Sequence, residues 1–542
     1  MEEYLERRKQ LIHADRAQRV DSPLNRASLT DLEQRADAVV RSIRTAEAKS
    51  VWAFESKSIF EYSPEDTSAN VFPGMEFLTA RNTIIQTKLF RVLNKMPKGA
   101  LLHAHLDATV NARVLLTIAL TQSAMHVRAS KRVTASTVKG TLPEFKGLSQ
   151  ANFTSFTSLT DEAYTPGEWV PIQKARENFD ASLGGPEGFD EWVVGALMIN
   201  PSEAYVTHNT TQKIWAKFTS TFVTSSGLIH FVPVWTEYIR QFFLSSIEDG
   251  ISYMEARVNF WHKCMIGADG KEDVPHREWL IIYDRVLNEV KDELKRQGRE
   301  DEFVGSKIIY VTLRHITSEE LEWYLEDCLS LKQEFPHLIA GFDLVGHEDS
   351  LKPLIDYIVP LTKFVERQKE LGLDIPFIFH AGETLGDGTP ADMNLYDAIL
   401  LGTKRIGHGF SLAKHPKLIE ICKEKDIAVE MCPISNEILR LTSSMPMHPL
   451  PILVNQGVSV ALCSDDPAVF GNMGLSFDFF QVLVASEVTG LITMGEFARD
   501  SLKHAAMGQE EKQRALDLWE KQWTKFLEWV VREETIRGQL KN

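Results

Sequence analysis

The sequence predicts a mixed α/β protein built on a (β/α)8 barrel of the TIM type. Eight short apolar segments follow one another from residue 99 onward, helical patterns separate most of them, and metal-binding types of residue stand at several C-terminal ends. Near-continuous apolar strands that alternate with helices are typical of a parallel sheet, and eight such units are typical of a closed barrel. A doubly wound open sheet is the competing architecture, but no Gly-x-Gly-x-x-Gly follows the first strand.

The first part of the chain, residues 1–95, predicts an N-terminal helical extension. It is rich in Glu, Arg, Ala and Leu at helical spacing. Thr30 is expected to cap a helix that continues through Ile43, because a threonine before an amphipathic run is a common helix start. The barrel is expected to occupy residues 96–542.

Eight strands and their connecting helices are expected in order along the barrel. The strands are predicted at residues 101–105, 251–258, 307–313, 339–346, 376–383, 405–410, 427–433 and 459–465. One or two long helices are predicted over residues 214–247, and further helices at residues 279–297, 318–334, 351–369, 418–425 and 496–539. These patterns rest on hydrophobic periodicity, which is the main signal of secondary structure in a sequence.

An insertion subdomain is expected within residues 111–210, on the loop after the first strand. The gap before the second strand is too long for one crossover helix, and residues 127–175 are rich in Ser, Thr, Pro and Gly. A disordered loop is the alternative interpretation. Trp169 and Trp192 favour packed structure, because large aromatic side chains usually bury their surface.

Composition excludes several classes of partner. The chain has 542 residues, of which 44% are hydrophobic and 25% charged, with a formal net charge of −16. Such an acidic balance argues against binding to nucleic acid, and no apolar run is long enough to span a membrane. The N-terminus shows no signal-peptide pattern and the five cysteines form no Cys-x-x-Cys, so a reduced, cytoplasmic location is expected.

Histidines and carboxylates at the strand ends predict a metal site. His103 and His105 are two residues apart on one strand and therefore point to the same face. His380 ends the fifth strand and Asp465 ends the eighth. Reactive residues of such barrels gather at the C-terminal strand ends, and imidazoles with a carboxylate suit one Zn²⁺ per chain.

Three further polar residues at the same strand ends predict acid and base chemistry. Glu383 could donate a proton to a substrate, while His408 and Asp466 could hold or deprotonate an attacking water. Zn²⁺ makes hydroxide available near neutral pH. Together these residues indicate metal-assisted hydrolysis.

The motifs that carry these residues resemble the adenosine deaminase family of metal-dependent amidohydrolases. The matching segments are residues 102–107, 341–349, 379–384, 405–409, 432–436 and 464–467. Residues 96–99, 346–349 and 215–238, together with the N-terminal extension and the insertion, are similar to the growth-factor-related, type 2 branch of that family.

The resemblance implies an enzyme that converts adenosine or 2′-deoxyadenosine to inosine or 2′-deoxyinosine and ammonia. By it, His103, His105, His380 and Asp465 would ligate zinc. Glu383 would protonate purine N1 while hydroxide, oriented by His408, attacks C6. Asp466 would contact the N7 side and the water, the Gly346 N–H would meet N3, and Asp107 would contact the ribose. The N-terminal helices could form a homodimer, by analogy with that branch.

Departures from the family pattern leave alternatives open. Ala108 follows Asp107 where the small deaminases commonly have glycine, and the insertion has no cysteine. The substrate could instead be adenine, an N6-substituted adenosine or AMP, and a non-catalytic growth-factor-like protein is a further alternative. Another hydrolase that opens a cyclic amide or an ester is disfavoured. Glu255 and Arg257 are expected to form a buried pair, and Glu348 to be structural.

Overall fold

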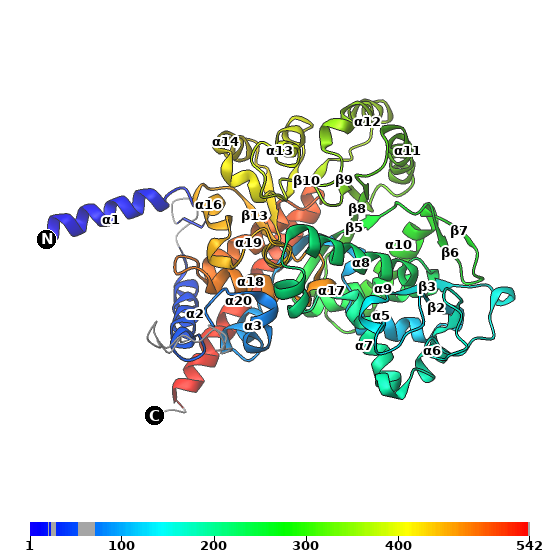
Figure 1. Cartoon of the computed structure of the whole chain (residues 1–542). Coiled ribbons are helices and arrows are strands. Elements are labelled where there is room, and N and C mark those ends of the chain that lie inside the picture. The colour runs from blue at the N-terminus through cyan, green and yellow to red at the C-terminus, as the bar shows by residue number, and fades with distance from the viewer. Residues whose placement is uncertain (20, 23–28, 53–70, 540–542) are drawn as a thin grey trace.

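The computed structural model describes residues 1–19, 21–22, 29–52 and 71–539, with the side chains of 534–539 left aside. Its N-terminal part is helical: α1 (Glu2–Arg16), α2 (Asp31–Ser50), α3 (Phe77–Ile84) and α4 (Lys88–Leu93). The predicted cap is confirmed, because the Thr30 hydroxyl accepts from the Glu33 N–H and the Glu33 carboxylate accepts from the Thr30 N–H. Helix α1 projects away from the rest of the molecule (Figure 1).

Parallel strands form the centre of the molecule, which confirms the mixed α/β class. One four-stranded sheet has the order β1-β5-β8-β9 and a second the order β10-β11-β12-β13. Their bounds are β1 (Gly99–His105), β5 (Ile251–Asn259), β8 (Gly305–Leu313), β9 (Ile339–Val345), β10 (Ile378–Ala381), β11 (Arg405–His408), β12 (Ala428–Met431) and β13 (Val460–Leu462). All eight lie within or overlap the predicted segments. Their side chains are buried on both faces of the sheets, which explains why the strands appear in the sequence as near-continuous apolar runs.

The two sheets are joined at both edges by isolated parallel bridges. Phe342 of β9 pairs with Phe377 just before β10, and Ala104 of β1 pairs with Asp465 just after β13. At the second junction the His105 N–H donates to the Asp465 carbonyl at 3.0 Å, and the Asp465 N–H donates to the His103 carbonyl at 3.1 Å. Asp465 is therefore held by backbone hydrogen bonds directly beside both histidines of β1.

Helices cover the outside of the sheets. They are α8 (Thr211–Ile229), α9 (Val232–Glu248), α10 (His276–Arg296), α11 (Ser318–Glu334), α12 (Ile358–Leu371), α13 (Pro390–Leu400), α14 (Pro416–Glu424), α15 (Pro433–Ile438), α16 (Leu450–Asn455), α17 (Pro467–Phe470), α18 (Ser476–Val484), α19 (Leu491–Lys503) and α20 (Gln509–Gln539). Two of the predicted helical segments have different bounds, and five helices between residues 390 and 484 were not predicted. The helix expected from residue 351 begins only at Ile358, because Pro353 disfavours a helical Lys352. The C-terminal run is broken between α19 and α20, where Gly508 lies.

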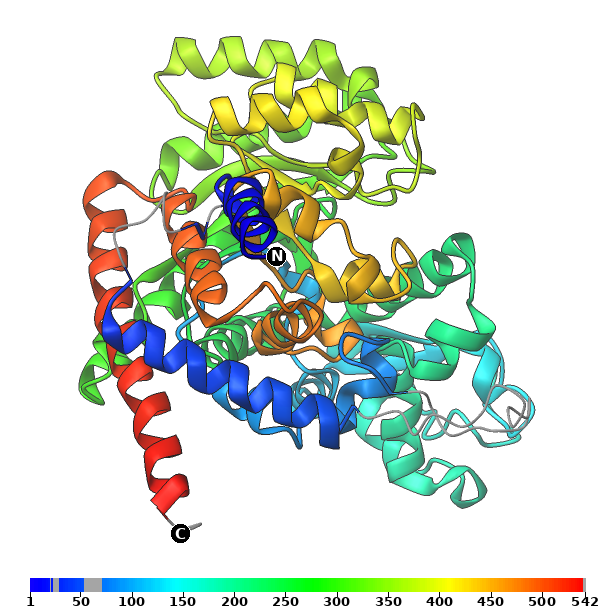
Figure 2. The same ribbon diagram turned by 90° about the vertical axis from the view of Figure 1, so that its left-hand side faces the viewer.

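The long C-terminal helix connects helix α2 to the sheets. Helix α20 packs against α2 and α19 (Figure 2). The indole N–H of the buried Trp519 donates to the Pro97 carbonyl at 3.0 Å, just before β1. Trp519 and Trp523, four residues apart, are both buried on one face of α20.

Residues after β1 form a small α/β unit at the end of the molecule opposite to α1 (Figure 1). Its elements are α5 (Ala112–Leu120), β2 (Met125–Ala129), β3 (Pro143–Gly147), β4 (Val170–Pro171), α6 (Ile172–Glu177) and α7 (Gly185–Leu197), with an antiparallel sheet of order β3-β2-β4. The Trp192 indole is buried and donates to the Thr141 carbonyl at 2.9 Å. Among the described helices, none is long and apolar enough to cross a membrane.

Candidate metal and active site

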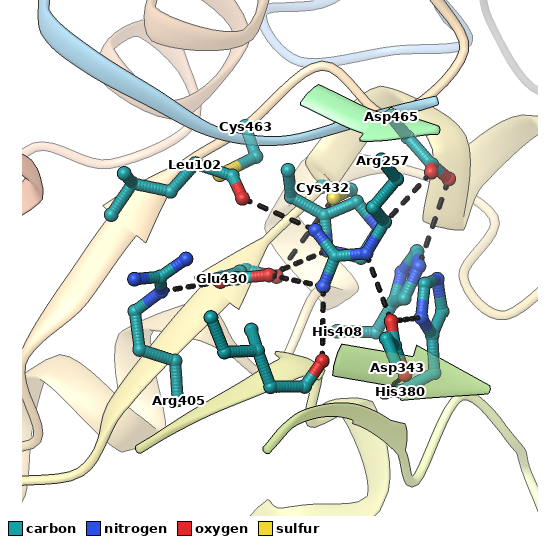
Figure 3. Close-up of polar contacts among 12 residues, drawn as sticks. Leu102, Arg257, Asp343, His380, Arg405, His408, Glu430, Cys432, Cys463 and Asp465 are labelled. Carbon is teal, nitrogen blue, oxygen red and sulfur yellow. Dashed lines mark hydrogen bonds and ion pairs between the residues drawn. The ribbon is translucent and has the colours of Figure 1, made fainter. Parts of the chain in front are cut away.

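Side chains from strands far apart in the sequence meet at the C-terminal strand ends. His103, His380, His408 and Asp465 place one potential ligand atom each within 4.8 Å of one another. Figure 3 shows His380, His408 and Asp465 of this group. Within the described chain, a second group of this kind contains His105, Asp465 and Asp466. All but the partly exposed His105 are buried. The three predicted histidine ligands thus lie around Asp465, the fourth predicted ligand, and His408 lies beside them.

Two of these residues have backbones that non-glycine residues rarely adopt. His408 has φ of 60° and Asp465 has φ of 58°, both in the left-handed region. Each stands where a buried strand turns into a loop, and hydrogen bonds at the strand end hold it there. Strain of this kind costs about 1–3 kcal/mol per residue and is concentrated at functional sites.

Two buried carboxylates fix the orientation of the imidazole rings of His103 and His380. The Nδ1 atom of His103 lies 2.8 Å from Glu430 Oε2, and Nδ1 of His380 lies 2.6 Å from Asp343 Oδ2. Each carboxylate accepts the Nδ1 hydrogen, so the lone pair of each ring is on Nε2. Histidine ligands of metals usually make such contacts through their second nitrogen.

A single guanidinium links these two carboxylates. Arg257 of β5 donates to Asp343 Oδ2 at 2.9 Å and to Glu430 Oε2 at 2.8 Å, and all three side chains are fully buried (Figure 3). The expected pairing of Arg257 with Glu255 is wrong, because Glu255 accepts from Arg405 instead. Both residues do face the interior, but their partners come from other strands.

The lone pairs of His103 Nε2 and Asp465 Oδ1 face each other at the centre of the site. His103 Nε2 and Asp465 Oδ1 are 3.3 Å apart, and His105 Nε2 lies 3.4 Å from the same oxygen. Among the described residues, neither His103 Nε2 nor Asp465 Oδ1 has a hydrogen-bond partner. Buried polar atoms are rarely left in this state. A cation shared by these imidazoles and Asp465 would satisfy them, so the donor set fits a divalent metal such as Zn²⁺.

Glu383 lies beside this cluster on a loop that a second carboxylate supports. Its backbone N–H donates to Glu348 Oε1 at 2.9 Å, and the Gly382 N–H donates to Glu348 Oε2 at 3.2 Å. Burial, followed by the negative charge of Asp465, raises the pKa of Glu383 well above its usual value. A buried carboxyl that stays protonated can act as an acid. Its Oε1 lies 3.7 Å from His408 Nδ1.

Two of the other predicted substrate contacts, Asp466 and Asp107, lie close to the same cluster. Burial and the charge of Asp465 raise the pKa of Asp466, and the charge of Asp107 contributes as well. Asp107 itself is partly exposed, just after β1, in a short 3-10 segment. Gly346 follows β9 with φ of 116°, a conformation that favours glycine. The effect of its charge on Asp466 indicates that Asp107 lies near the Asp466 carboxyl.

Three charged residues of the site were absent from the predicted set: Glu430, Asp343 and Arg405. With Arg257 they form a buried network of charges under the histidines. Glu348, expected to be structural, supports the Glu383 loop. The available signal was a single charged residue inside an otherwise apolar strand, as in Ala-Val-Glu-Met over β12. A buried charge of that kind requires a partner.

Comparisons with known proteins identify the family and the fold of this chain. A family model described as adenosine deaminase matches residues 197–522. The adenosine deaminase 2 proteins of Pongo abelii and Homo sapiens are each 32% identical over 457 residues, which cover 84% of this chain and 83% of each relative. The solved N6-methyl-AMP deaminase of Arabidopsis thaliana matches with a TM-score of 0.52 at 16% identity, over 80% of this chain and 98% of that one. That likeness shows a shared fold.

Proposed function

We propose that this chain deaminates adenosine and 2′-deoxyadenosine. It belongs to the adenosine deaminase family and to the type 2 branch of that family. Water replaces the amino group at C6, and the products are inosine or 2′-deoxyinosine and ammonia. The observation that carries the proposal is the meeting of His103, His380 and Asp465 beside the buried carboxyl of Glu383, whose pKa is raised by burial and by the charge of Asp465. Relatives of this chain bear the name adenosine deaminase, which supports the substrate class.

We assign one zinc ion per chain to His103, His105, His380 and Asp465. When bound, zinc supplies Lewis-acid chemistry that makes water a nucleophile near neutral pH. The unpaired lone pairs on His103 Nε2 and Asp465 Oδ1 support this assignment, as do the carboxylates that hold His103 and His380 by Nδ1. Imidazole and carboxylate donors are the ligands that catalytic zinc sites use.

The chain's own residues then have separate roles around the purine. Glu383 donates a proton to N1, which makes C6 more electrophilic. His408 and Asp466 orient the attacking water, and Asp466 also contacts N7. The Gly346 N–H meets N3 and Asp107 contacts the ribose. Support for Glu383 comes from its burial, because desolvation raises the pKa of a carboxyl and so favours the form that carries a proton to donate.

We also infer that the two sheets together form one (β/α)8 barrel over residues 96–542, with residues 111–210 as an insertion and residues 1–95 as an extension that mediates dimerisation. The bridges Phe342–Phe377 and Ala104–Asp465 support closure of the ring at both junctions. The site would then occupy the C-terminal mouth of the barrel, where enzymes of this architecture place their reactive residues.

A substrate panel on one purified sample tests the proposed function. The panel contains adenine, adenosine, 2′-deoxyadenosine, N6-methyladenosine and AMP, and the loss of the aminopurine absorbance is followed with and without chelator. We expect turnover of the two nucleosides, lost on chelation. Preference for adenine, N6-methyladenosine or AMP would indicate the alternative deaminase specificity, and no turnover of any substrate would favour a growth-factor-like binding protein.

The variant Glu383→Gln separates chemistry from metal binding. It keeps the shape of the side chain but removes the acidic proton, so turnover should fall by about 10²–10⁴-fold while metal content stays unchanged. Retention of near-normal turnover in this variant would refute the role of Glu383.

A further inference from the structure

A row of hydrogen bonds connects a backbone amide to the imidazole of His408, and we call it the amide relay. The Leu450 N–H donates to Nδ1 of His448 at 3.0 Å. Nε2 of His448 lies 3.0 Å from Asn436 Oδ1, and Asn436 Nδ2 lies 3.2 Å from Nδ1 of His408. The side chains of His448, Asn436 and His408 are all buried.

The direction of every bond in the amide relay follows from its first member. A backbone N–H can only donate, so Nδ1 of His448 has no hydrogen, and the neutral ring carries its hydrogen on Nε2. Burial lowers the pKa of His448 to about 3, which keeps that ring neutral. Nε2–H then donates to Asn436 Oδ1, and the amide NH₂ of Asn436 donates to His408. His408 therefore accepts at Nδ1 and has its hydrogen on Nε2.

The open end of the amide relay faces the candidate metal site. Nε2 of His408 lies 3.7 Å from Asp465 Oδ2, and its ring centroid is 4.7 Å from that of His103. A nitrogen that carries a hydrogen has no lone pair, so it can neither ligate a metal nor take a proton from water. It can donate a hydrogen bond to a nearby oxygen that faces it.

We propose that Asn436 and His448 are positioning residues that fix His408 as a hydrogen-bond donor to the attacking water and to Asp465, and so keep this imidazole out of the metal's coordination. The inference rests on the proposed function for its mechanistic meaning. Helix α15 positions both Asp465 and His408. Ser435 donates to Asp465 Oδ2 at 2.7 Å, and the next residue, Asn436, donates to His408. An edge-to-face contact between Phe410 and His448, with centroids 5.4 Å apart, holds the far end of the relay.

The variant Asn436→Asp inverts the amide relay with almost no change of shape. A carboxylate cannot donate, so His408 must place its hydrogen on Nδ1 and turn the Nε2 lone pair toward the metal. We expect kcat to fall by at least about 100-fold, as for loss of one oriented hydrogen-bond donor, with KM for adenosine changed less than about threefold. Zinc affinity, measured by chelator competition, should rise because a further nitrogen becomes available. Asn111→Asp, at the exposed N-cap of α5, is the matched control.

The tautomer itself can be observed without any turnover. In metal-free protein labelled with ¹⁵N-histidine, the His408 resonances should show the hydrogen on Nε2 in the wild-type chain and on Nδ1 in Asn436→Asp. If that variant does not fold, His448→Phe removes the donor to Asn436 and should give a mixture of both His408 tautomers. A hydrogen on Nδ1 in the wild-type protein, or wild-type kcat in Asn436→Asp, would overturn the proposal. Because the tautomer readout needs no substrate, its result is independent of whether adenosine is the substrate.

Discussion

Asp343 Oδ2 lies 2.6 Å from Nδ1 of His380, and the Oδ1 atom of the same carboxylate accepts the backbone N–H of His380 at 2.9 Å. One side chain thus fixes both the main chain and the ring of a proposed metal ligand. The variant Asp343→Asn keeps the shape of this side chain but removes the charge that favours the Nδ1–H tautomer. We expect zinc affinity to fall about 10–100-fold in a chelator competition. Asp397→Asn, on α13, is the control, and unchanged affinity in Asp343→Asn would contradict the assigned role.

Gly407 of β11 lies against the ring of His103. A Cβ atom at this position would be 3.0 Å from Cε1 and 3.2 Å from Nδ1 of His103, closer than side chains normally pack. We expect Gly407→Ala to displace the ring and to weaken zinc binding on the order of tenfold, with a smaller effect on the melting temperature. Gly195→Ala, in α7 with open space around it, should leave both quantities unchanged. Equal zinc affinity in both variants would show that His103 is free to move.

Arg257 balances two buried carboxylates at once. Burial lowers the pKa of Arg257, but the charges of Glu430 and Asp343 outweigh this and raise it, so the guanidinium stays charged. In Arg257→Met the carboxylates would remain buried without their cation, and the loss of unfolding free energy should be about 3–5 kcal/mol. Denaturant unfolding of the metal-free protein measures this. Arg257→Lys should recover only part of the loss, because an ammonium lacks the forked donors. Wild-type stability of Arg257→Met would be incompatible with the network described.

The sequence allowed the clustering of the proposed metal ligands to be predicted, but not the network of charges beneath them. His103 and His105 are adjacent on one strand face, and the C-terminal ends of parallel strands meet, so proximity to His380 and Asp465 followed from the fold class. The partners of Arg257 are 86 and 173 residues away. Which of them it meets depends on strand register and side-chain rotamers, and neither leaves a spacing pattern in the sequence.

Helix boundaries show a similar limit. The helix expected at 351–369 starts at Ile358, because Pro353 and the short 3-10 turn Leu354–Tyr357 come first. Hydrophobic periodicity indicated a helix, and Leu361 and Phe364 are buried on one face of α12. The local effect of one proline determines where that helix begins.

Glu437 gives the folded protein a pH dependence that can be measured. Burial raises the pKa of Glu437 to about 8, although the Phe77 N–H and the Tyr205 hydroxyl both donate to its Oε2. Between pH 4.5, the usual value, and pH 8 the folded state holds this proton and the unfolded state has lost it. Stability contributed by the protonated carboxyl is therefore lost as pH rises through this window, by up to about 1.4 kcal/mol per pH unit.

The variant Glu437→Gln removes that titration. Its melting temperature should fall less steeply between pH 5 and pH 8 than that of the wild-type protein, by calorimetry at matched ionic strength. Tyr205→Phe, which keeps the carboxyl, should retain the wild-type slope. Parallel pH profiles for Glu437→Gln and the wild-type chain would contradict a raised pKa at this position.

One zinc ion, held by three imidazoles and Asp465, is the group on which we propose that deamination depends. The decisive experiment measures metal content and adenosine turnover on the same purified sample, before chelation, after chelation and after Zn²⁺ is returned. We expect one zinc per chain, turnover that disappears with the metal and returns with it, and no stoichiometric zinc in a His103→Ala, His380→Ala double variant. Full turnover by metal-free protein, or stoichiometric zinc in the double variant, would show that this ion does not have the proposed role.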